Sequence, residues 1–456
     1  MKIVVFFAGP LAALLIGMSL SYCGYPSDIG WTAAVTTLMA IWWIFEPIPI
    51  PATSLIPLAF FPLTGVLSEA DVAAAYGHKL VLLMLGGFML SAAMEKSGAH
   101  RRIALGMVNL FGGSNGKALV FGFMAASALL SMWISNAATT LMLLPIAMAV
   151  VNQAQDRRLQ VSLLLGIAYA ASVGGVATPI GTPPNVVFIS IFAEHSGNEM
   201  SFVDWMTYAM PVVLVMLPIV GFWLTRGVNK IDPIALPKVG HWRFEEILTM
   251  IVFGLTAVLW MTRNQPFGGW SELFQLTSAN DAQVAIAGAV AMFVIPNGKG
   301  SRLLDWETAS KIPWGILILF AGGICIAKAF GASGLSAELG SFLANLKSLP
   351  VLILIGAICL AVTFLTEVTS NTATTTLLMP ILLAAAVAAE MDPKIFMIPA
   401  TISASFAFML PVATPPNAIV FGSQKFSVKD MVREGLVLNL IGVVVVTLIC
   451  YFFLGT

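Results

Sequence analysis

The stretch Ser135-Asn136-Ala137-Ala138-Thr139-Thr140 recurs, with one residue changed, as Ser370-Asn371-Thr372-Ala373-Thr374-Thr375, 235 positions later. Each copy lies inside an apolar run and is followed by a proline, Pro145 in the first copy and Pro380 in the second. Ser and Asn are poor residues for a helix interior and good residues for a helix N-terminus. The two stretches therefore predict two apolar segments that are each interrupted by the start of a new helix.

Two further landmarks repeat in the same order. Thr182-Pro183-Pro184-Asn185 recurs as Thr414-Pro415-Pro416-Asn417 after 232 positions, and Gly86-Gly87 is matched by Gly322-Gly323 after 236 positions. Three matched landmarks indicate that the chain contains one unit twice. In membrane proteins, matched interruptions of apolar segments in two halves are the best sequence indication of a transport site.

The composition is that of a membrane protein. Of 456 residues, 59% are hydrophobic and only 10% are charged, and the mean hydropathy is +0.93. Soluble domains carry roughly 25% charged residues. At ~20 residues per spanning helix, the chain has room for about 11 transmembrane helices in an all-α polytopic fold that lies in a lipid bilayer. The net charge is zero, which predicts no nucleic-acid partner.

Two further apolar segments are interrupted near their Ser-Asn stretches, which predicts hairpins and not membrane spans. Apolar runs predict helices over 3–23, 31–48, 53–67, 80–97, 160–193, 205–225, 245–262, 281–295, 313–331, 395–421 and 433–454. Segments 118–151 and 350–388 contain the Ser-Asn stretches, and the arms of the first measure ~22–26 Å at 1.5 Å per residue, less than the ~30 Å hydrocarbon core. We expect both segments to be re-entrant hairpins, each entering and leaving on one side.

Counting both hairpins as non-crossing gives a clear charge asymmetry. With the N-terminus inside, all but five of the 22 Lys and Arg residues face the cytoplasm, the exceptions being Lys79, Arg263, Lys328, Lys347 and Lys394. This is a strong positive-inside bias. The same count places the two hairpins on opposite sides, so the two repeats are predicted to be inverted in the membrane.

The landmarks divide the chain into four predicted parts. The N-terminal scaffold helices occupy 1–79, the first inverted repeat 80–225, a linker with connecting helices 226–312, and the second inverted repeat 313–454. The first repeat contains hairpin 118–151 and a broken helix at 160–193. The second contains hairpin 350–388 and a broken helix at 395–421.

The chemistry of these motifs suits an anion and a cation together. A helix that starts at a hairpin tip directs its free N–H groups and positive dipole end into the membrane, where an anion is the natural ligand. The Pro-rich breaks must unwind, which frees backbone carbonyls as oxygen ligands for an alkali cation. The alternative for the Ser-Asn stretches is ordinary polar contact between helices, and for the breaks a simple proline kink. Both alternatives are disfavoured because the motifs are doubled.

The sequence carries few charges to neutralise an anion. Neither hairpin contains an arginine, so a co-transported cation is expected to offset the charge of the substrate. Glu367, just ahead of the second tip, is interpreted as a structural hydrogen-bond acceptor rather than a proton or cation site. Gly-Lys-Ser/Thr and His-Glu-x-x-His motifs are missing, and the four histidines are scattered. We therefore predict that the chain is not an enzyme, and rank a channel or an intramembrane hydrolase far behind a transporter.

These residues, together with the run from Trp42 to Pro49, resemble the divalent anion/sodium symporter family, which includes bacterial dicarboxylate transporters and animal citrate and sulfate carriers. The resemblance covers nearly the whole chain. It implies a homodimer in the bacterial inner (plasma) membrane, with a fixed scaffold domain and a transport domain that moves as an elevator. It also implies Na⁺ as the coupling ion and a small anionic di- or tricarboxylate as the substrate.

The resemblance assigns ligands by position. The first sodium site would use Ser131, Ser135, Asn136 and the carbonyl of Gly181. The second would use Thr366, Thr369, Asn371 and the carbonyl of Ala413. Substrate carboxylates would meet Ser135, Asn136, Thr182 and Pro183 from one repeat, and Ser370, Asn371, Thr372, Thr414 and Pro415 from the other.

One position departs from the family pattern. The third residue of the first motif is Ala137, where the family usually has threonine, so one hydrogen bond to the substrate should be missing. The expected function is sodium-coupled symport of a di- or tricarboxylate of the succinate, malate, fumarate or citrate class. The alternatives are sodium-independent carboxylate antiport and symport of a divalent anion such as sulfate.

Overall fold

The protein is built from helices throughout the part of the chain that the structure describes. This structure, a computed structural model, describes residues 2–111, 115–154, 156–197, 200–228, 240–264, 269–276, 278–343 and 349–455. Within these ranges no strand is found, and nine helices are long and apolar enough to span a membrane. The predicted all-α polytopic fold is confirmed. Seven of these nine correspond to predicted helices, and the other two, Asn136–Gln153 and Asn371–Ala388, are the second arms of the two segments expected to be hairpins. Of the remaining predicted helices, those over 53–67 and 281–295 are shorter than a full span, and those over 160–193 and 395–421 are broken.

The first half of the chain runs from α1 to α12. Its helices are α1 (Lys2–Tyr22), α2 (Ser27–Phe45), α3 (Ile50–Thr53), α4 (Ile56–Thr64), α5 (Glu69–Tyr76), α6 (Lys79–Ser97), α7 (Ala99–Phe111), α8 (Gly116–Ser131), α9 (Asn136–Ala154), α10 (Arg157–Gly175), α11 (Pro183–Ser196) and α12 (Phe202–Thr225).

The second half runs from α13 to α23. Its helices are α13 (Phe244–Met261), α14 (Gly269–Leu273), α15 (Asp281–Val294), α16 (Trp306–Ala309), α17 (Trp314–Ser333), α18 (Leu335–Leu343), α19 (Val351–Thr366), α20 (Asn371–Ala388), α21 (Pro393–Ala404), α22 (Pro415–Phe421) and α23 (Val428–Leu454). Within the predicted linker part 226–312, residues 229–239, 265–268 and 277 lie outside the described residues.

The helices α6 to α12 are matched one by one by α17 to α23. The final pair shows the duplication clearly, because α12 and α23 both begin with a capping box. Ser201 and Asp204 exchange side-chain and backbone hydrogen bonds at the start of α12, and Ser427 and Asp430 do the same at the start of α23. Such a box satisfies two free N–H groups of a new helix. The sequence Ser-x-x-Asp is thus a further repeated landmark.

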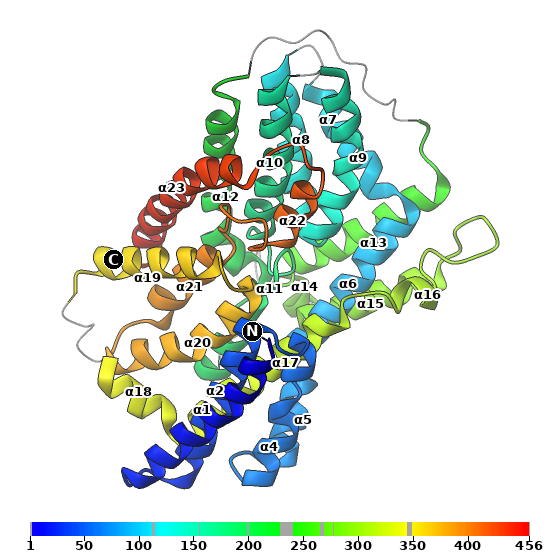
Figure 1. The fold of residues 1–456 in the computed structure, drawn as a ribbon. Coiled ribbons are helices and arrows are strands. Elements are labelled where there is room, and N and C mark those ends of the chain that lie inside the picture. The colour runs from blue at the N-terminus through cyan, green and yellow to red at the C-terminus, as the bar shows by residue number, and fades with distance from the viewer. Residues whose placement is uncertain are drawn as a thin grey trace.

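Each Ser-Asn stretch joins two helices that pack against each other. α8 ends at Ser131 and α9 begins at Asn136, while α19 ends at Thr366 and α20 begins at Asn371. α10 packs against both α8 and α9, and α21 packs against both α19 and α20. In Figure 1, α8 and α9 lie in the upper part of the molecule and α19 and α20 lie at the lower left.

The two repeats exchange their short helices. α11, which follows the break in the first repeat, packs against α20 and α21 of the second. α22, which follows the break in the second repeat, packs against α9 and α10 of the first. Both α11 and α22 lie near the centre of the molecule (Figure 1). This exchange brings the Thr-Pro-Pro-Asn motif of each repeat to the hairpin of the other.

Glycines permit the closest helix contacts around this centre. A Cβ atom on Gly86 of α6 would lie 2.6 Å from the Cβ of Ala285, and one on Gly322 of α17 would lie 2.7 Å from the carbonyl oxygen of Ser54. On the next residue, a Cβ on Gly323 would collide with the Thr376 side chain of α20. The repeated Gly-Gly pair therefore lets α6 and α17 approach their neighbours at backbone distance.

Some predicted boundaries differ from the structure. The stretch 53–67, expected as one helix, is divided between α3 and α4, which begin at or next to prolines. α7 and α18 were not expected at all. Their sequences are amphipathic, and α7 lays its buried residues, including Leu105 and Val108, against α8. A search for continuous apolar runs does not detect such helices.

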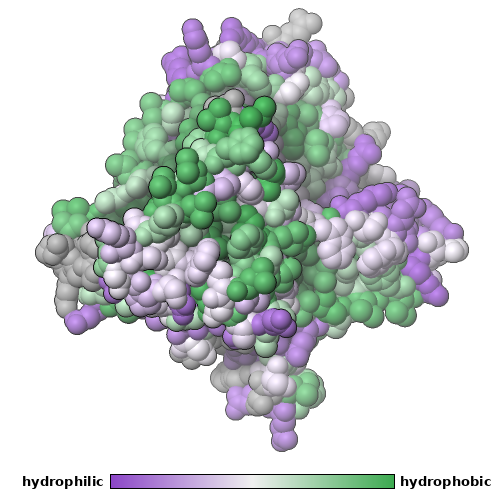
Figure 2. All heavy atoms as spheres, turned by 60° about the horizontal axis from the view of Figure 1, so that its bottom comes forward, coloured by the Kyte–Doolittle hydropathy of each residue, from purple (hydrophilic) through white to green (hydrophobic). Residues whose placement is uncertain are grey.

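The outer surface is that of a protein immersed in lipid. Figure 2 shows apolar residues over much of one face, with hydrophilic residues gathered towards its extremities. Large apolar side chains such as Leu214, Phe222, Leu440 and Phe452 are exposed on the long helices α12 and α23. In water such an apolar surface would be unfavourable, whereas the hydrocarbon core of a bilayer accepts it.

Candidate functional site

The first oxygen cluster lies where α8 ends and α9 begins. The Ser131 hydroxyl donates a 2.5 Å hydrogen bond to Oδ1 of Asn136. A Cβ placed on Gly175 would lie 2.6 Å from this same Oδ1 and 3.1 Å from the carbonyl oxygen of Gly181. The structure therefore brings three of the four predicted ligands of the first sodium site together around Gly175. All three ligand atoms are oxygens, the donor type that suits an alkali cation.

Ser135, the fourth predicted ligand, has a different local role. Its hydroxyl accepts a 3.1 Å hydrogen bond from the backbone N–H of Ala138 and so caps α9, as its position predicted. Ser135 also lines a small cavity of about 10 Å³ together with Gly87, Ser91 and Ile180. A cavity of this size has room for about one water molecule.

The second cluster repeats the first with different residue types. The Thr366 hydroxyl lies 2.7 Å from Oδ1 of Asn371 and 2.9 Å from the carbonyl oxygen of Ala404. In both repeats the hydroxyl of the fifth residue before the motif asparagine contacts the asparagine side chain. Ala413, whose carbonyl is a further predicted ligand, donates its own N–H to the Leu410 carbonyl at 3.2 Å.

The hydroxyl of Thr369, also a predicted ligand of the second site, bonds to residues outside this cluster. It donates to the Leu365 carbonyl at 2.8 Å and lies 2.5 Å from the hydroxyl of Thr374. The position corresponding to Thr369 in the first repeat is Ile134, which has no hydroxyl. As a result the Thr139 hydroxyl, which corresponds to Thr374, is buried without a hydrogen-bond partner among the described residues.

The predicted substrate residues lie at the starts of four helices. Ser370 is the N-cap of α20, but its hydroxyl makes no capping bond. Thr182 and Thr414 are the N-caps of α11 and α22, and the Thr414 hydroxyl accepts a 3.3 Å bond from the Asn417 backbone. Pro183 and Pro415 are the first residues of those two helices, where the missing N–H costs nothing.

The third residues of the two motifs are both partly exposed. Ala137 lies in the first turn of α9, and Thr372 lies at the corresponding place in α20. The Thr372 carbonyl accepts a bond from Thr376. The two helix starts therefore differ by one hydroxyl group, which the second repeat has and the first lacks.

In each repeat the break is tied to the hairpin tip at corresponding positions. In the first, the Thr178 hydroxyl donates to the Met132 carbonyl. In the second, the backbone N–H of Leu410, which corresponds to Thr178, donates at 3.0 Å to Glu367, which corresponds to Met132. In the first repeat a side chain of the break donates to the backbone at the tip, and in the second the backbone of the break donates to a side chain at the tip.

Glu367 acts as the predicted structural acceptor. Its carboxylate also accepts from the Met409 N–H at 2.9 Å and from Nδ2 of Asn439 on α23 at 2.6 Å. Asn439 in turn accepts from the Phe408 N–H at 3.2 Å. These bonds fix the unwound segment between α21 and α22 against α23, because buried N–H groups outside a helix need an acceptor.

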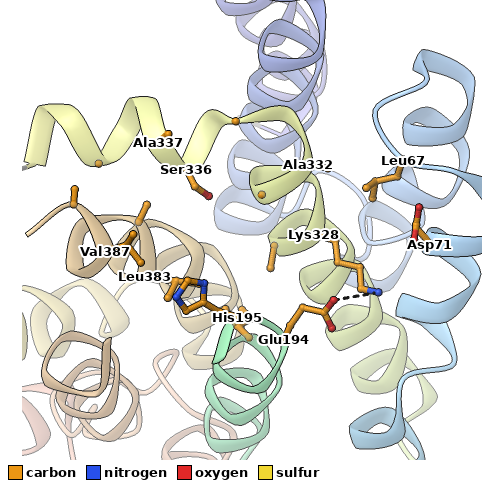
Figure 3. Close-up of a pocket in the computed structure, with 17 residues that line it drawn as sticks. Leu67, Asp71, Glu194, His195, Lys328, Ala332, Ser336, Ala337, Leu383 and Val387 are labelled. Carbon is orange, nitrogen blue, oxygen red and sulfur yellow. Dashed lines mark ion pairs between the residues drawn. The ribbon is translucent and has the colours of Figure 1, made fainter. Parts of the chain in front are cut away.

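A larger cavity of about 780 Å³ lies at the opposite ends of α11 and α20 from the oxygen clusters. It is also lined by the C-terminal part of α17 and by α18 (Figure 3). Lys328 of α17 points towards Glu194 of α11, with 3.3 Å between Nζ and Oε1, and Asp71 and His195 are also in its lining. The ion pair thus joins α17 to α11 across the wall of this cavity.

Several residues that hold the site were not among the predicted ligands. Asn185 and Asn417 belong to the repeated motif, and both are completely buried and bonded to the carbonyls of their breaks. Trp205 of α12 also donates to the Val176 carbonyl at 2.9 Å. The matched Asn residues were a signal in the sequence, but the direction of their bonds depends on how each break closes.

Comparisons with known proteins agree with this architecture. Residues 10–454 match the family described as "Sodium:sulfate symporter transmembrane region". The "Sodium-dependent dicarboxylate transporter SdcS" of Staphylococcus aureus, in strains bovine RF122 / ET3-1 and MSSA476, is 38% identical to this chain over 480 residues. The match covers 98% of this chain and 92% of the relative.

Solved structures show the same fold at low identity. The YdaH transporter of Alcanivorax borkumensis superposes with a TM-score of 0.60 at 14% identity, covering 87% of this chain and 88% of that one. MtrF of Neisseria gonorrhoeae superposes with a TM-score of 0.61 at 13% identity, covering 87% and 84% respectively.

The apolar spans, the matched family and the bacterial relative confirm the predicted multi-pass protein of the bacterial plasma membrane. They also confirm that the chain is a transporter and not an enzyme. Since the family match extends over nearly the whole chain, as the doubled motifs predicted, the chain belongs to the sodium:sulfate symporter family, the divalent anion/sodium symporters.

Proposed function

We propose that this protein couples inward movement of Na⁺ to uptake of a small dicarboxylate across the bacterial plasma membrane. The observation that carries the proposal is the doubled oxygen cluster, Ser131 with Asn136 and Thr366 with Asn371. Na⁺ is cargo in this scheme, and each cluster, with the carbonyl of Gly181 or Ala413, would hold one ion. The similarity to a protein named as a sodium-dependent dicarboxylate transporter supports both the ion and the substrate class.

The substrate would bind between the two repeats. The N-termini of α9, α11, α20 and α22 supply free N–H groups and positive dipole ends, which favour carboxylates. One carboxylate would meet Ser135, Asn136, Thr182 and Pro183, and the other would meet Ser370, Asn371, Thr372, Thr414 and Pro415. Bound Na⁺ beside both helix starts would offset the substrate charge that no arginine of the hairpins neutralises.

Transport by purified protein in liposomes tests this proposal. Uptake of radiolabelled succinate is expected only when an inward Na⁺ gradient is imposed, and K⁺ or Li⁺ gradients of the same size serve as controls. Uptake that is unaffected by Na⁺ but needs vesicles preloaded with a second carboxylate would instead establish the antiport alternative. Competition by malate, fumarate, citrate and sulfate then defines the substrate class, including the tricarboxylate and sulfate alternatives.

We further propose an elevator movement, in which a transport domain slides against a scaffold that includes residues 1–79. The cavity of about 780 Å³ supports this, because it lies between the C-terminal ends of α11 and α20 and the C-terminal part of α17, where Lys328 and Glu194 face each other. A cavity at such a boundary leaves space for displacement without repacking a core. The family resemblance adds a homodimer, which light scattering on protein in detergent micelles or nanodiscs would detect as twice the mass of one chain.

A further inference from the structure

Two asparagines occupy equivalent, completely buried positions in the two repeats. Nδ2 of Asn185 donates to the carbonyls of Gly175, Val176 and Thr178 at 3.2, 3.1 and 2.8 Å. Nδ2 of Asn417 donates in the same way to carbonyls ten and seven residues before it, at 2.9 and 3.0 Å. Those carbonyls belong to Ala407 and Leu410, which correspond to Gly175 and Thr178.

The broken helices explain why a side-chain donor is needed. Gly175 is the last residue of α10, and the other four acceptor residues lie after the end of α10 or α21, so no intrahelical N–H is available to any of these carbonyls. Each break contains one proline, Pro179 or Pro411, and is followed by a Pro-Pro pair at the start of the next helix, so few backbone N–H donors are available nearby. A buried carbonyl that lacks a hydrogen-bond partner is destabilising, because it has lost its bonds to water. The carboxamide NH₂ of each asparagine reaches back from the next helix and satisfies these groups.

Each asparagine also acts on the turn that carries a proposed sodium ligand. The Thr178 carbonyl accepts from Nδ2 of Asn185 at 2.8 Å and from the backbone N–H of Gly181 at 3.3 Å. The Gly181 carbonyl is the proposed ligand of the first site. One carbonyl therefore anchors both the asparagine and the turn that orients this ligand.

The second repeat has the same arrangement. The Leu410 carbonyl accepts from Nδ2 of Asn417 at 3.0 Å and from the backbone N–H of Ala413 at 3.2 Å. The Ala413 carbonyl is the proposed ligand of the second site. The two asparagines also agree in their second amide atom. Oδ1 of both is buried and makes no hydrogen bond within the described residues. Within the described residues, the side-chain hydrogen bonds of both asparagines are therefore made by their NH₂ groups.

The first asparagine has an additional route to its site. Asn185 holds the Gly175 carbonyl, and Gly175 lies so close to Asn136 that an added Cβ would be 2.6 Å from Oδ1. Gly175 therefore packs directly against the proposed ligand oxygens of Asn136 and Gly181, and a small shift of Gly175 would displace them.

We propose that Asn185 and Asn417 are positioning residues, one for each sodium site, which hold the carbonyls of Gly181 and Ala413 in place for the ion. The inference rests on the proposed sodium coupling. It predicts a specific pairing, in which Asn185 acts with Ser131 and Asn417 acts with Thr366. Residues that orient metal ligands typically change affinity by about 10–100-fold when they are replaced.

The test measures the sodium concentration that gives half-maximal succinate binding to purified protein. Asn185→Leu and Asn417→Leu keep most of the side-chain volume and remove the donor, and each is expected to raise that concentration by about tenfold. Matched controls remove a buried or partly buried hydroxyl from the same short segments without touching the breaks. Ser190→Ala and Ser423→Ala, whose hydroxyls bond to Val187 and Val420, should leave the value unchanged.

Double variants distinguish positioning from general loosening of the fold. Combined with Ser131→Ala, Asn185→Leu should add little further loss, whereas combined with Thr366→Ala its effect should multiply. Asn417→Leu should show the reverse pattern. A wild-type sodium requirement in either leucine variant, or multiplication with both partners, would overturn the inference.

Two outcomes concern folding and the underlying function. If Asn185→Leu does not yield monodisperse protein, Asn185→Ser, which keeps one shorter donor, should still raise the half-maximal sodium concentration, and an unchanged value would count against the inference. If wild-type protein binds succinate without any response to Na⁺, the proposed sodium coupling fails, and this inference fails with it. Failure of the asparagine variants alone leaves sodium coupling intact.

Discussion

Thr366 contacts the side-chain oxygen of Asn371 at 2.7 Å, and Ser131 makes the corresponding contact with Asn136, 235 residues earlier. Both contacts span five residues and join the last residue of one hairpin arm to the first residue of the other. The hydroxyl at this position has changed from serine to threonine while the contact has stayed. Its retention across the repeats indicates that the oxygen pair itself matters for the site.

Replacing either asparagine is expected to abolish sodium-driven uptake. Asn136→Ala and Asn371→Ala each remove a proposed ion ligand at the start of a helix. The milder changes Ser131→Ala and Thr366→Ala should retain uptake but raise the sodium requirement, because one ligand is lost and the rest remain. Liposome uptake at several sodium concentrations checks this. Normal transport by a well-expressed asparagine variant would show that the site assignment is wrong.

Gly175→Ala should remove the first sodium site by crowding it. The new methyl group would lie 2.6 Å from Oδ1 of Asn136, well inside contact distance. Overpacking of this kind typically lowers the free energy of unfolding by about 1–3 kcal/mol, and thermal unfolding would detect this loss of stability. The matched control is Gly166→Ala in the same helix, where the methyl would meet the flexible Met124 side chain at 3.1 Å. We expect sodium-dependent binding to fail in the first variant and persist in the second, and equal binding by both would refute the crowding argument.

The hairpin ends were predictable because their signals are local. A Ser-Asn pair in an apolar run indicates a new helix near residue 137, and α9 begins at Asn136. The predicted break in 160–193 likewise corresponds to the gap between α10 and α11, since Pro and Gly act on the backbone where they stand. Such effects need no knowledge of the rest of the molecule.

The contacts between repeats were not predictable in this way. The sequence shows that α11 and α22 are equivalent, but not that each packs on the hairpin of the other repeat. The role of Asn185 depends on three carbonyls that converge only when the break closes. For the sodium and substrate ligands themselves, the assignments remain predictions that the experiments above test.

Ala137→Thr should change the preference among carboxylates. Thr372 provides a hydroxyl at the equivalent position of the second repeat, whereas Ala137 provides none. An added hydrogen bond contributes about 1 kcal/mol, so affinity for a substrate that can accept it should rise roughly fivefold. Competition of succinate uptake by malate, fumarate, citrate and sulfate measures the change. Thr372→Ala is the mirror experiment, and an unaltered profile in Ala137→Thr would show that position 137 does not touch the substrate.

Asp305→Asn tests the link between α6 and the loop before α16. The ammonium of Lys96, 2.7 Å from Asp305, holds the pKa of this carboxyl well below its usual range, helped by the Thr308 backbone N–H. A lowered pKa means that the stabilisation is present at neutral pH and is lost as the pH falls below the unfolded value of about 4.

Because Asp305 is partly exposed, the effect should be small, at most about 1 kcal/mol. Asparagine keeps the acceptor for Thr308, so the variant removes the charge and leaves the helix cap. The difference in thermal stability between wild type and variant should be largest at pH 7 and low salt. It should shrink towards pH 3 and in high salt. A difference that stays constant would mean that the ion pair contributes nothing.

Joining α11 to α17 should stop an elevator. Glu194 and Lys328 lie 3.3 Å apart across the cavity boundary and are both within reach of a reagent from outside, since their side chains are 38% and 17% exposed. In a background without the four native cysteines, Glu194→Cys with Lys328→Cys should be linked by a short cleavable thiol reagent. We expect the link to abolish uptake and a reductant to restore it.

The control pair is Glu307→Cys with Lys311→Cys, one helical turn apart on an exposed segment, where the same link should have no effect. Full transport by the linked Glu194–Lys328 pair would mean that α11 and α17 do not move apart there, and that the moving boundary must lie elsewhere in the fold.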